Sequence, residues 1–261
     1  MSRISATGSS EVTVNGVRWI NAEEFFAGLG RVNIFVGGYG SGKSEVAVNF
    51  SLSLAARGQK VSIADLDIVN PYFRSRAARA VLEKNGVGLI LPPVEIMESD
   101  LPLIQPEIAG ALKNATSRLV LDIGGDPVGA KVLASLVQWL PGDDYNCFLV
   151  LNSRRPFSGS VLEVEKLIAG IEQSSGVGIT HLVINSHLIE ETERAVIEEG
   201  IELGKAVSKK TAKPIGFVAI EDRIFEKLAT VDLPYPVLVL HRLLLKPWEE
   251  NEKLGPRCFK L

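Results

Sequence analysis

Apolar stretches alternate with helical patterns along most of this chain. Apolar and β-branched runs predict strands at residues 31–36, 60–65, 87–91, 118–122, 146–151, 181–185, 215–220 and 236–241. Between these runs, apolar side chains recur at helical spacing, which predicts helices at 45–57, 74–81, 107–114, 160–173, 191–210 and 222–228. Regular alternation of helices with long apolar strands favours a mostly parallel sheet covered on both faces. We therefore expect a three-layer α/β fold with a mostly parallel sheet flanked by helices.

The two ends of the chain follow other patterns. Apolar and polar residues alternate over 12–14 and again over 17–19, with the turn-forming pair Asn15-Gly16 between them, which predicts a β-hairpin. In the tail, Pro247 and neighbouring acids interrupt the apolar residues, so no membrane-binding helix is expected there. We expect a hairpin extension over residues 1–30, one α/β domain over 31–242 and a tail over 243–261.

Composition narrows the class of protein. Of the 261 residues 46% are hydrophobic and 23% are charged, which suits one large α/β domain. The net charge of -3 gives no global basic field that would favour nonspecific nucleic-acid binding. The 2 cysteines lie far apart, which argues against a disulfide framework or an iron–sulfur site and indicates a cytoplasmic location. No apolar run approaches the ~20 residues that span a bilayer.

A glycine-rich stretch after the first predicted core strand carries the strongest chemical signal. The sequence GGYGSGKS at residues 37–44 fits the phosphate-binding pattern G-x-x-x-x-G-K-[ST], with a predicted strand before it and a helix after it. Lys43 would neutralise the β- and γ-phosphates, and the Ser44 hydroxyl would bind Mg²⁺. This context disfavours a flexible glycine loop without a ligand. We predict a nucleotide-binding P-loop made of Gly37, Gly38, Tyr39, Gly40, Ser41, Gly42, Lys43, Ser44 and Glu45.

Acidic residues follow two of the predicted strands. Asp65 and Asp67 close the second core strand, and Asp122 closes a later one. Ligands of open α/β sheets bind at the carboxyl ends of strands, so these acids can face the nucleotide, although helix capping would also explain a single acid. Asp122 matches the Walker B position, from which a carboxylate reaches Mg²⁺. We expect Ser44, Asp67 and Asp122 to bind the metal ion, and Gly125 to lie near the γ-phosphate.

Taken in chain order, these motifs resemble the MinD/ParA branch of P-loop ATPases, also called cobyrinic-acid-synthase-like or CobQ/CobB-like, which includes the nitrogenase iron protein. The resemblance covers residues 31–240 and includes Asp-x-Asp, Asp-x-x-Gly and a late asparagine, Asn185. It implies ATP and Mg²⁺ as cofactors, with Asn185 at the adenine. It also implies catalytic roles for Lys43, Asp67 and Asp126, with the two aspartates as alternatives for orienting the attacking water.

The sequence departs from this branch inside the P-loop. The branch commonly has a lysine after the first P-loop glycine, and this lysine reaches across a nucleotide-sandwich dimer; here the position is Gly38, and Tyr39 stands where a glycine is usual. A nucleotide-dependent homodimer stays a candidate, because an arginine could supply the charge instead. The arginines near the predicted site are Arg74, Arg76, Arg154 and Arg155.

These features favour an ATPase that acts as a nucleotide-dependent switch on an unknown protein partner. The alternative on the same scaffold is a metabolic kinase or an ATP-dependent ligase of the dethiobiotin or cobyrinate synthase type. The missing lysine slightly favours this alternative, but no acceptor-binding motif is recognisable. DNA binding is disfavoured, because glutamates are interspersed with Lys205, Lys209 and Lys210.

Overall fold

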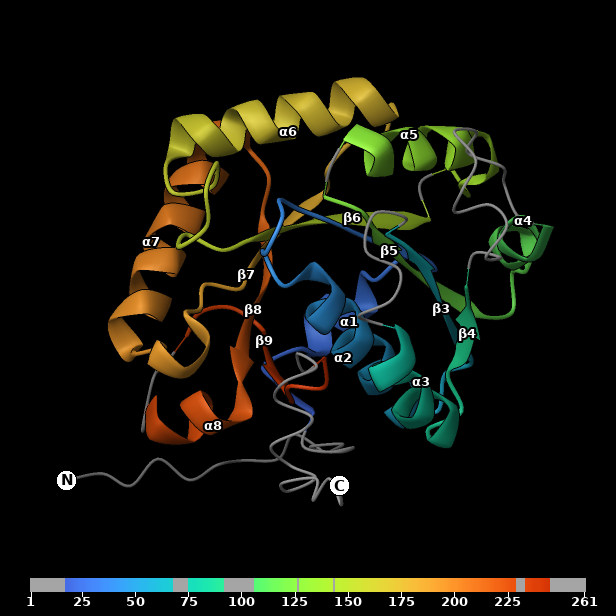
Figure 1. Cartoon of the computed structure of the whole chain (residues 1–261), viewed down its shortest axis with the longest axis horizontal. Helices are drawn as coiled ribbons and strands as arrows, with labels where there is room; N and C mark the ends of the chain where they lie inside the picture. Colours follow the sequence, from blue (N-terminus) through green and yellow to red (C-terminus); the bar gives the residue numbers. More distant parts are fainter. Residues whose placement is uncertain are drawn as a thin grey trace, which may run out of the picture.

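The structure, a computed structural model, describes residues 17–67, 75–91, 106–125, 127–142, 144–228 and 233–244, and their side chains except at 75–77, 127 and 128. In these ranges the chain forms one nine-stranded sheet with helices on both faces (Figure 1). The predicted three-layer α/β class is confirmed. No helix in the described ranges is long and apolar enough to cross a membrane.

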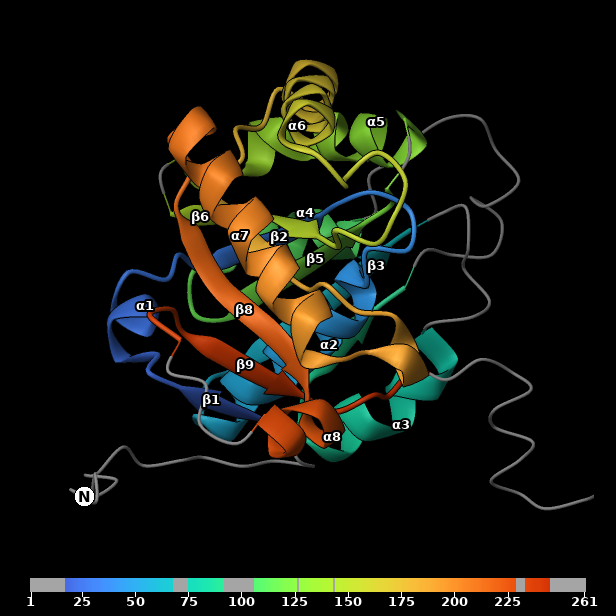
Figure 2. The same ribbon diagram turned by 90° about the vertical axis from the view of Figure 1, so that its left-hand side faces the viewer.

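The sheet is parallel except at one edge. Its order is β1-β9-β8-β7-β6-β2-β5-β3-β4, and β1 pairs antiparallel with β9 (Figure 2). Because β2 lies between β5 and β6, the carboxyl ends of the central strands meet at one edge of the sheet. The bounds are β1 (Arg18–Ile20), β2 (Val32–Val36), β3 (Val61–Leu66), β4 (Gly88–Ile90), β5 (Arg118–Ile123), β6 (Tyr145–Leu151), β7 (His181–Ile184), β8 (Ile215–Glu221) and β9 (Val237–Leu240).

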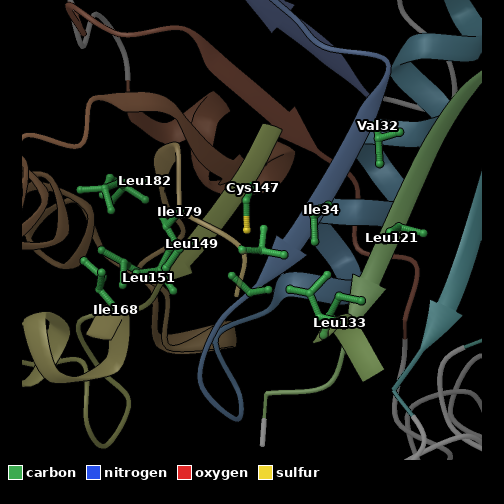
Figure 3. Close-up of a cluster of buried hydrophobic side chains, with 14 of the residues drawn as sticks. Val32, Ile34, Leu121, Leu133, Cys147, Leu149, Leu151, Ile168, Ile179 and Leu182 are labelled. Atoms are coloured by element: carbon green, nitrogen blue, oxygen red, sulfur yellow. The ribbon is translucent and has the colours of Figure 1, made fainter. Parts of the chain in front are cut away.

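The helices divide the core into two layers. Side chains of α4 to α8 pack on one face of the sheet, in the cluster that Figure 3 shows in part, and those of α1 to α3, where described, pack on the other. Apolar side chains are buried on nearly every side of α2, which places this helix deep in the fold. The bounds are α1 (Glu23–Ala27), α2 (Lys43–Ala56), α3 (Ser75–Lys84), α4 (Pro106–Lys113), α5 (Pro127–Leu136), α6 (Val161–Ser175), α7 (Arg194–Thr211) and α8 (Asp222–Phe225).

Aromatic side chains attach the first described segment to the main core. The Trp19 ring lies 5.2 Å from that of Phe25, 6.0 Å from that of Phe50 and 5.0 Å from that of Phe217, centroid to centroid. These contacts and the pairing of β1 with β9 join the N-terminal segment to the sheet. The first strand and turn of the predicted hairpin lie outside the described residues, so the hairpin and the proposed boundary at residue 30 stay predictions.

Candidate functional site

The loop between β2 and α2 has the backbone shape of a phosphate-binding loop. Gly40 and Gly42 have φ of +74° and +83°, a left-handed conformation that L side chains rarely adopt. A Cβ on Gly42 would also lie 2.3 Å from Nδ2 of Asn185. Helix α2 begins directly after this glycine, at Lys43, so the positive end of its dipole lies at the loop. Backbone and dipole together favour an anion here.

The P-loop lysine is buried beside one of the predicted acids. Nζ of Lys43 lies 3.5 Å from Oδ2 of Asp67, and the two side chains are 3% and 7% exposed. Opposite charges attract more strongly where little water screens them. A phosphate that enters the loop would therefore compete with Asp67 for Lys43.

The other two acids lie side by side on adjacent strands. Asp65 in β3 and Asp122 in β5 are register partners, and both are buried. With Ser44 at the start of α2, they line a small cavity of about 20 Å³, which has room for about one water-sized group. The structure thus groups Asp65 with the predicted metal ligands Ser44 and Asp122, whereas it places Asp67 against Lys43.

This donor set fits Mg²⁺ bound together with a nucleotide. In the described part of the chain, no three His, Cys, Asp or Glu side chains are placed to hold a metal ion by themselves. Mg²⁺ at phosphate sites takes one or two protein carboxylates, and its octahedron is completed by phosphate oxygens and waters. The Ser44 hydroxyl and the carboxylates of Asp65 and Asp122 supply oxygen ligands of this kind.

The turn after β5 approaches the P-loop through its backbone. A Cβ on Gly125 would lie 2.3 Å from the carbonyl oxygen of Gly37 and 3.2 Å from the backbone nitrogen of Tyr39. Glycine is the residue that fits such a close approach of two backbones. The predicted role of Gly125 near the γ-phosphate stays a prediction. Asp126, the predicted alternative for orienting water, lies outside the described residues.

A larger cavity of about 240 Å³ opens beside the P-loop and extends along the ends of β7 and β8. Its lining includes Lys43 and Ser44 of α2, Asn185 after β7, Ile220 in β8 and Arg242 after β9. Concave, largely apolar sites with a few polar groups are typical of cofactor binding. The cavity therefore offers a place for the base and sugar of a nucleotide whose phosphates lie in the P-loop.

Asn185 supports the P-loop directly. Its Nδ2 donates to the carbonyl of Ser41 at 2.8 Å, and its side chain lies in the lining of the larger cavity. With the amide nitrogen used in this way, the amide oxygen is the group through which Asn185 could contact a base. The predicted adenine contact stays a prediction, and the sequence did not indicate the contact with Ser41.

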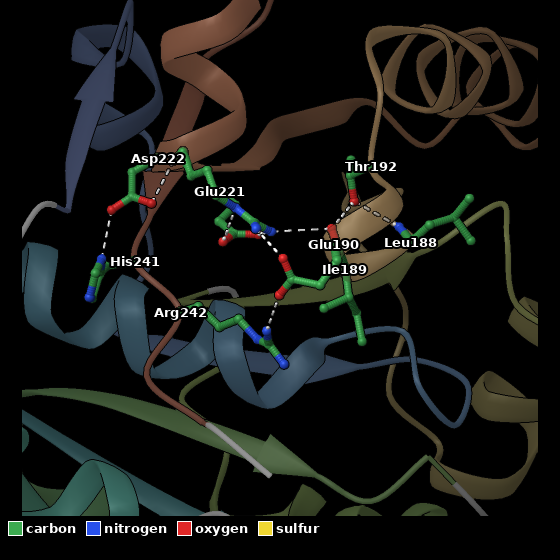
Figure 4. Close-up of polar contacts among 9 residues, drawn as sticks. Leu188, Ile189, Glu190, Thr192, Glu221, Asp222, His241 and Arg242 are labelled. Carbon is green, nitrogen blue, oxygen red and sulfur yellow. Dashed lines mark hydrogen bonds and ion pairs between the residues drawn. The ribbon is translucent and has the colours of Figure 1, made fainter. Parts of the chain in front are cut away.

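A charged network, drawn in Figure 4, includes Glu221 and Arg242 from the lining of this cavity. Glu190 pairs with Arg223 of α8 and, at 3.1 Å, with Arg242, while Asp222 lies 2.6 Å from Nδ1 of His241. These contacts join the segments that follow β7, β8 and β9. They could not be predicted from the sequence, because the three segments are far apart in the chain.

Glu45, predicted to bind nucleotide, holds the chain that follows β9. Its carboxylate accepts the N–H groups of Leu243 at 2.8 Å and Leu244 at 3.0 Å, and Asn49 bonds both backbone groups of His241. Burial raises the pKa of Glu45 to about 6, against the lowering effect of these N–H donors. Glu45 also lines the larger cavity, so its predicted role at the nucleotide stays open beside this structural one.

His187 gives the cavity a pH dependence that can be measured. Burial and the neighbouring cations Arg155 and Arg242 lower its pKa from 6.5 to about 4. Between pH 6.5 and pH 4, His187 is protonated in the unfolded chain and neutral in the folded one. The free energy of unfolding therefore falls as the pH falls through this range. Between pH 7 and pH 4 we expect the free energy of unfolding of wild type to fall by about 3 kcal/mol more than that of His187→Gln, as measured by urea unfolding. If the free energies of unfolding of the two proteins change in parallel with pH, this expectation is contradicted. Glu45 is present in both proteins, so its titration cancels in the difference between them.

The remaining predicted residues lie at the surface near the loop. Tyr39 is 77% exposed, so a nucleotide contact through its ring is not evident. Arg155 donates from Nε to the carbonyl of Gly40 at 3.1 Å, and Arg154 pairs with Glu199. The side chains of the other two candidate arginines, at positions 74 and 76, lie outside the described residues.

Comparison with known proteins identifies the fold. No model of a known protein family matches the chain, and neither does any curated protein. Chloroplast FtsY from Physcomitrella patens is similar in structure, with a TM-score of 0.50 and 15% identity over 72% of this chain and 58% of that protein. The cell division protein FtsY from Thermotoga maritima has a TM-score of 0.51 and 14% identity, over 77% of this chain and 69% of that protein.

These likenesses concern the architecture alone. The chain spans less than two thirds of the Physcomitrella protein, and neither structure is named as a member of the MinD/ParA branch. Membership of that branch is therefore not confirmed. The parallel sheet, the P-loop between β2 and α2 and the two FtsY structures show that this chain has a P-loop NTPase fold.

Proposed function

We propose that this chain binds ATP with Mg²⁺, hydrolyses it and acts as a MinD/ParA-type switch on a protein partner. The observation that supports this proposal is the grouping of three buried acids around Lys43 and Ser44, which line the 240 Å³ cavity: Asp67 pairs with Lys43, and Asp65 and Asp122 line the small cavity together with Ser44. A phosphate loop without a metal ion would need no such acids.

The ion pair of Lys43 with Asp67 supplies a means of switching. A γ-phosphate that draws Lys43 away would change the environment of Asp67 and of the chain that follows it. Mg²⁺, held by Ser44, Asp65 and Asp122, would supply positive charge to the phosphates. Loops that contact the γ-phosphate and Mg²⁺ are the usual switch elements of such proteins.

The acids at the end of β8 favour adenine over guanine. A protein commonly recognises guanine through a carboxylate that accepts hydrogen bonds from the N–H groups of the base. Here Glu221 pairs with Arg223 at 3.1 Å, and Asp222 lies 2.6 Å from His241. Because both carboxylates already have cationic or imidazole partners, they are less suited to guanine.

Exposed apolar side chains near the P-loop support a protein partner. Tyr39 in the loop and Phe157 after β6 are each 77% exposed, and large apolar side chains in loops beside a nucleotide are suited to contact another protein. The partner could also be a second copy of the chain. We place the protein in the cytoplasm as part of this proposal.

The test measures binding and hydrolysis separately. Fluorescent ATP and GTP analogues are titrated with and without Mg²⁺, and phosphate release is followed for wild type and Asp126→Asn. We expect ATP to bind at least about tenfold more tightly than GTP, and slow turnover that requires Mg²⁺ and falls in the variant. Tighter GTP binding would overturn the ATP assignment alone. Binding without turnover would favour the kinase or ligase alternative, and no binding would overturn the whole proposal.

A further inference from the structure

A third cavity, of about 260 Å³, lies between α5, α6 and the carboxyl ends of β2 and β5. It shares no lining residue with the cavity beside Asn185. Figure 1 shows α5 and α6 side by side over this edge of the sheet. Its walls are mostly apolar and include Leu133 of α5 with Leu167 and Ile171 of α6. A concave apolar site of this size is suited to a small organic ligand.

One charged side chain determines what kind of ligand fits. Lys166 is the only charged residue among the described residues that line the cavity, and no ion pair or hydrogen bond of its side chain occurs within the described ranges. Ala130, in the first turn of α5, also lines the cavity, so the positive end of this helix dipole lies close by. Both features favour an anion. We infer that this cavity binds a small molecule with an apolar body and one carboxylate.

The cavity is also continuous with the phosphate loop. Gly37, the first P-loop residue, and Gly125 both line it, and a Cβ on Gly125 would lie 2.3 Å from the Gly37 carbonyl oxygen. A ligand in this cavity therefore touches the two loops that approach each other beside the phosphate site. Coupling between two such sites is reciprocal, so the carboxylate and the nucleotide would change each other's affinity. This coupling rests on the proposed function, whereas binding of the carboxylate does not.

The first experiment locates the ligand without any nucleotide. Hexanoate, 1-hexanol and hexylammonium share an apolar body and differ in charge, and each is titrated into methyl-labelled protein observed by NMR. We expect hexanoate to shift the methyl signals of Leu133, Leu167 and Ile171 and to leave Ile220 and Ile224, which line the other cavity, unchanged. Hexanoate should bind about threefold more tightly than hexanol, because Lys166 is exposed and an exposed ion pair contributes about 0.2–1 kcal/mol.

Two substitutions test the assigned residues. Gly170 lines the cavity, and a Cβ there would meet nothing within 4 Å, so Gly170→Phe should fill the space without a backbone clash and abolish hexanoate binding. Gly110→Phe in α4 is the matched control, because that glycine also faces open space and does not line the cavity. Lys166→Met should remove the preference for hexanoate over hexanol, and Lys166→Arg should keep it.

Three results would overturn the inference. Equal affinity for the three probes would show that the cavity does not select a carboxylate. Undiminished binding to Gly170→Phe would show that hexanoate does not bind in this cavity. Methyl shifts confined to Ile220 and Ile224 would place the ligand in the other cavity. The coupling has its own readout. An ATP affinity that hexanoate leaves unchanged, in a protein that binds both, would overturn the coupling while the proposed ATP binding stands.

Discussion

Replacing Lys43 by alanine is expected to lower the affinity for ATP by at least about a hundredfold. The ammonium group is buried at the start of α2, in a loop whose glycines and helix dipole favour an anion. A hydrogen bond from a cation to phosphate oxygens contributes about 1.5–3 kcal/mol, and the fixed position of a buried lysine adds to this. Isothermal titration with Mg-ATP gives the affinity of the wild type and the variant directly.

The control must separate lost binding from lost folding. Removal of Lys43 also removes the ion-pair partner 3.5 Å from the buried Asp67 carboxylate, and breaking a buried pair costs about 3–5 kcal/mol. The double variant Lys43→Ala, Asp67→Asn removes both charges and should recover most of the stability in urea unfolding, yet not the ATP affinity. Lys60→Ala, at an exposed lysine before β3, should bind ATP like wild type. ATP affinity within threefold of wild type in the folded double variant would show that the P-loop does not bind the nucleotide.

The elements of this fold could be predicted where the sequence pattern is local. Strands such as β2 and β6 are mainly apolar, because parallel strands are buried on both faces. Helix α5 was missed, although Pro127 at its first position and the apolar residues Val132, Leu133 and Leu136 are typical of a helix that starts at a proline. The glycines shortly before Pro127 are typical of a turn, so the local pattern does not mark the start of this helix clearly.

The site could be predicted only in part, for a related reason. The P-loop is a contiguous motif, and the order of the parallel strands brings Asp65 and Asp122 beside it. Residue type and strand ends therefore predict acids at this edge of the sheet, although they point to Asp67 and not to Asp65 as the metal ligand. The contacts of Asn185 with Ser41 and of Glu45 with Leu243 join segments far apart in the chain. No local pattern encodes such contacts, since they depend on where the chain after β7 and after β9 returns to α2.

Gly125→Ala is expected to reduce turnover about a hundredfold while Mg-ATP still binds. The added Cβ would lie 2.3 Å from the Gly37 carbonyl oxygen and 3.0 Å from the carbonyl carbon of Gly38. These are backbone atoms, so no side chain can rotate away, and either the turn after β5 or the P-loop must move. A displacement of about 1 Å at a reacting centre can cost a hundredfold in rate.

Gly125→Ala tests the steric clash alone. Gly125 does not have a positive φ, so an alanine there causes no backbone strain of its own. Overpacking of this kind should lower the free energy of unfolding by about 1–3 kcal/mol, which urea unfolding measures alongside phosphate release at saturating ATP. Gly28→Ala is the matched control: its Cβ would meet the Glu24 carbonyl oxygen at 3.9 Å, an ordinary contact, and neither property should change. Wild-type turnover by Gly125→Ala would mean that the turn and the P-loop need not approach each other during hydrolysis. In that case the switch would depend on Lys43 and Asp67 instead.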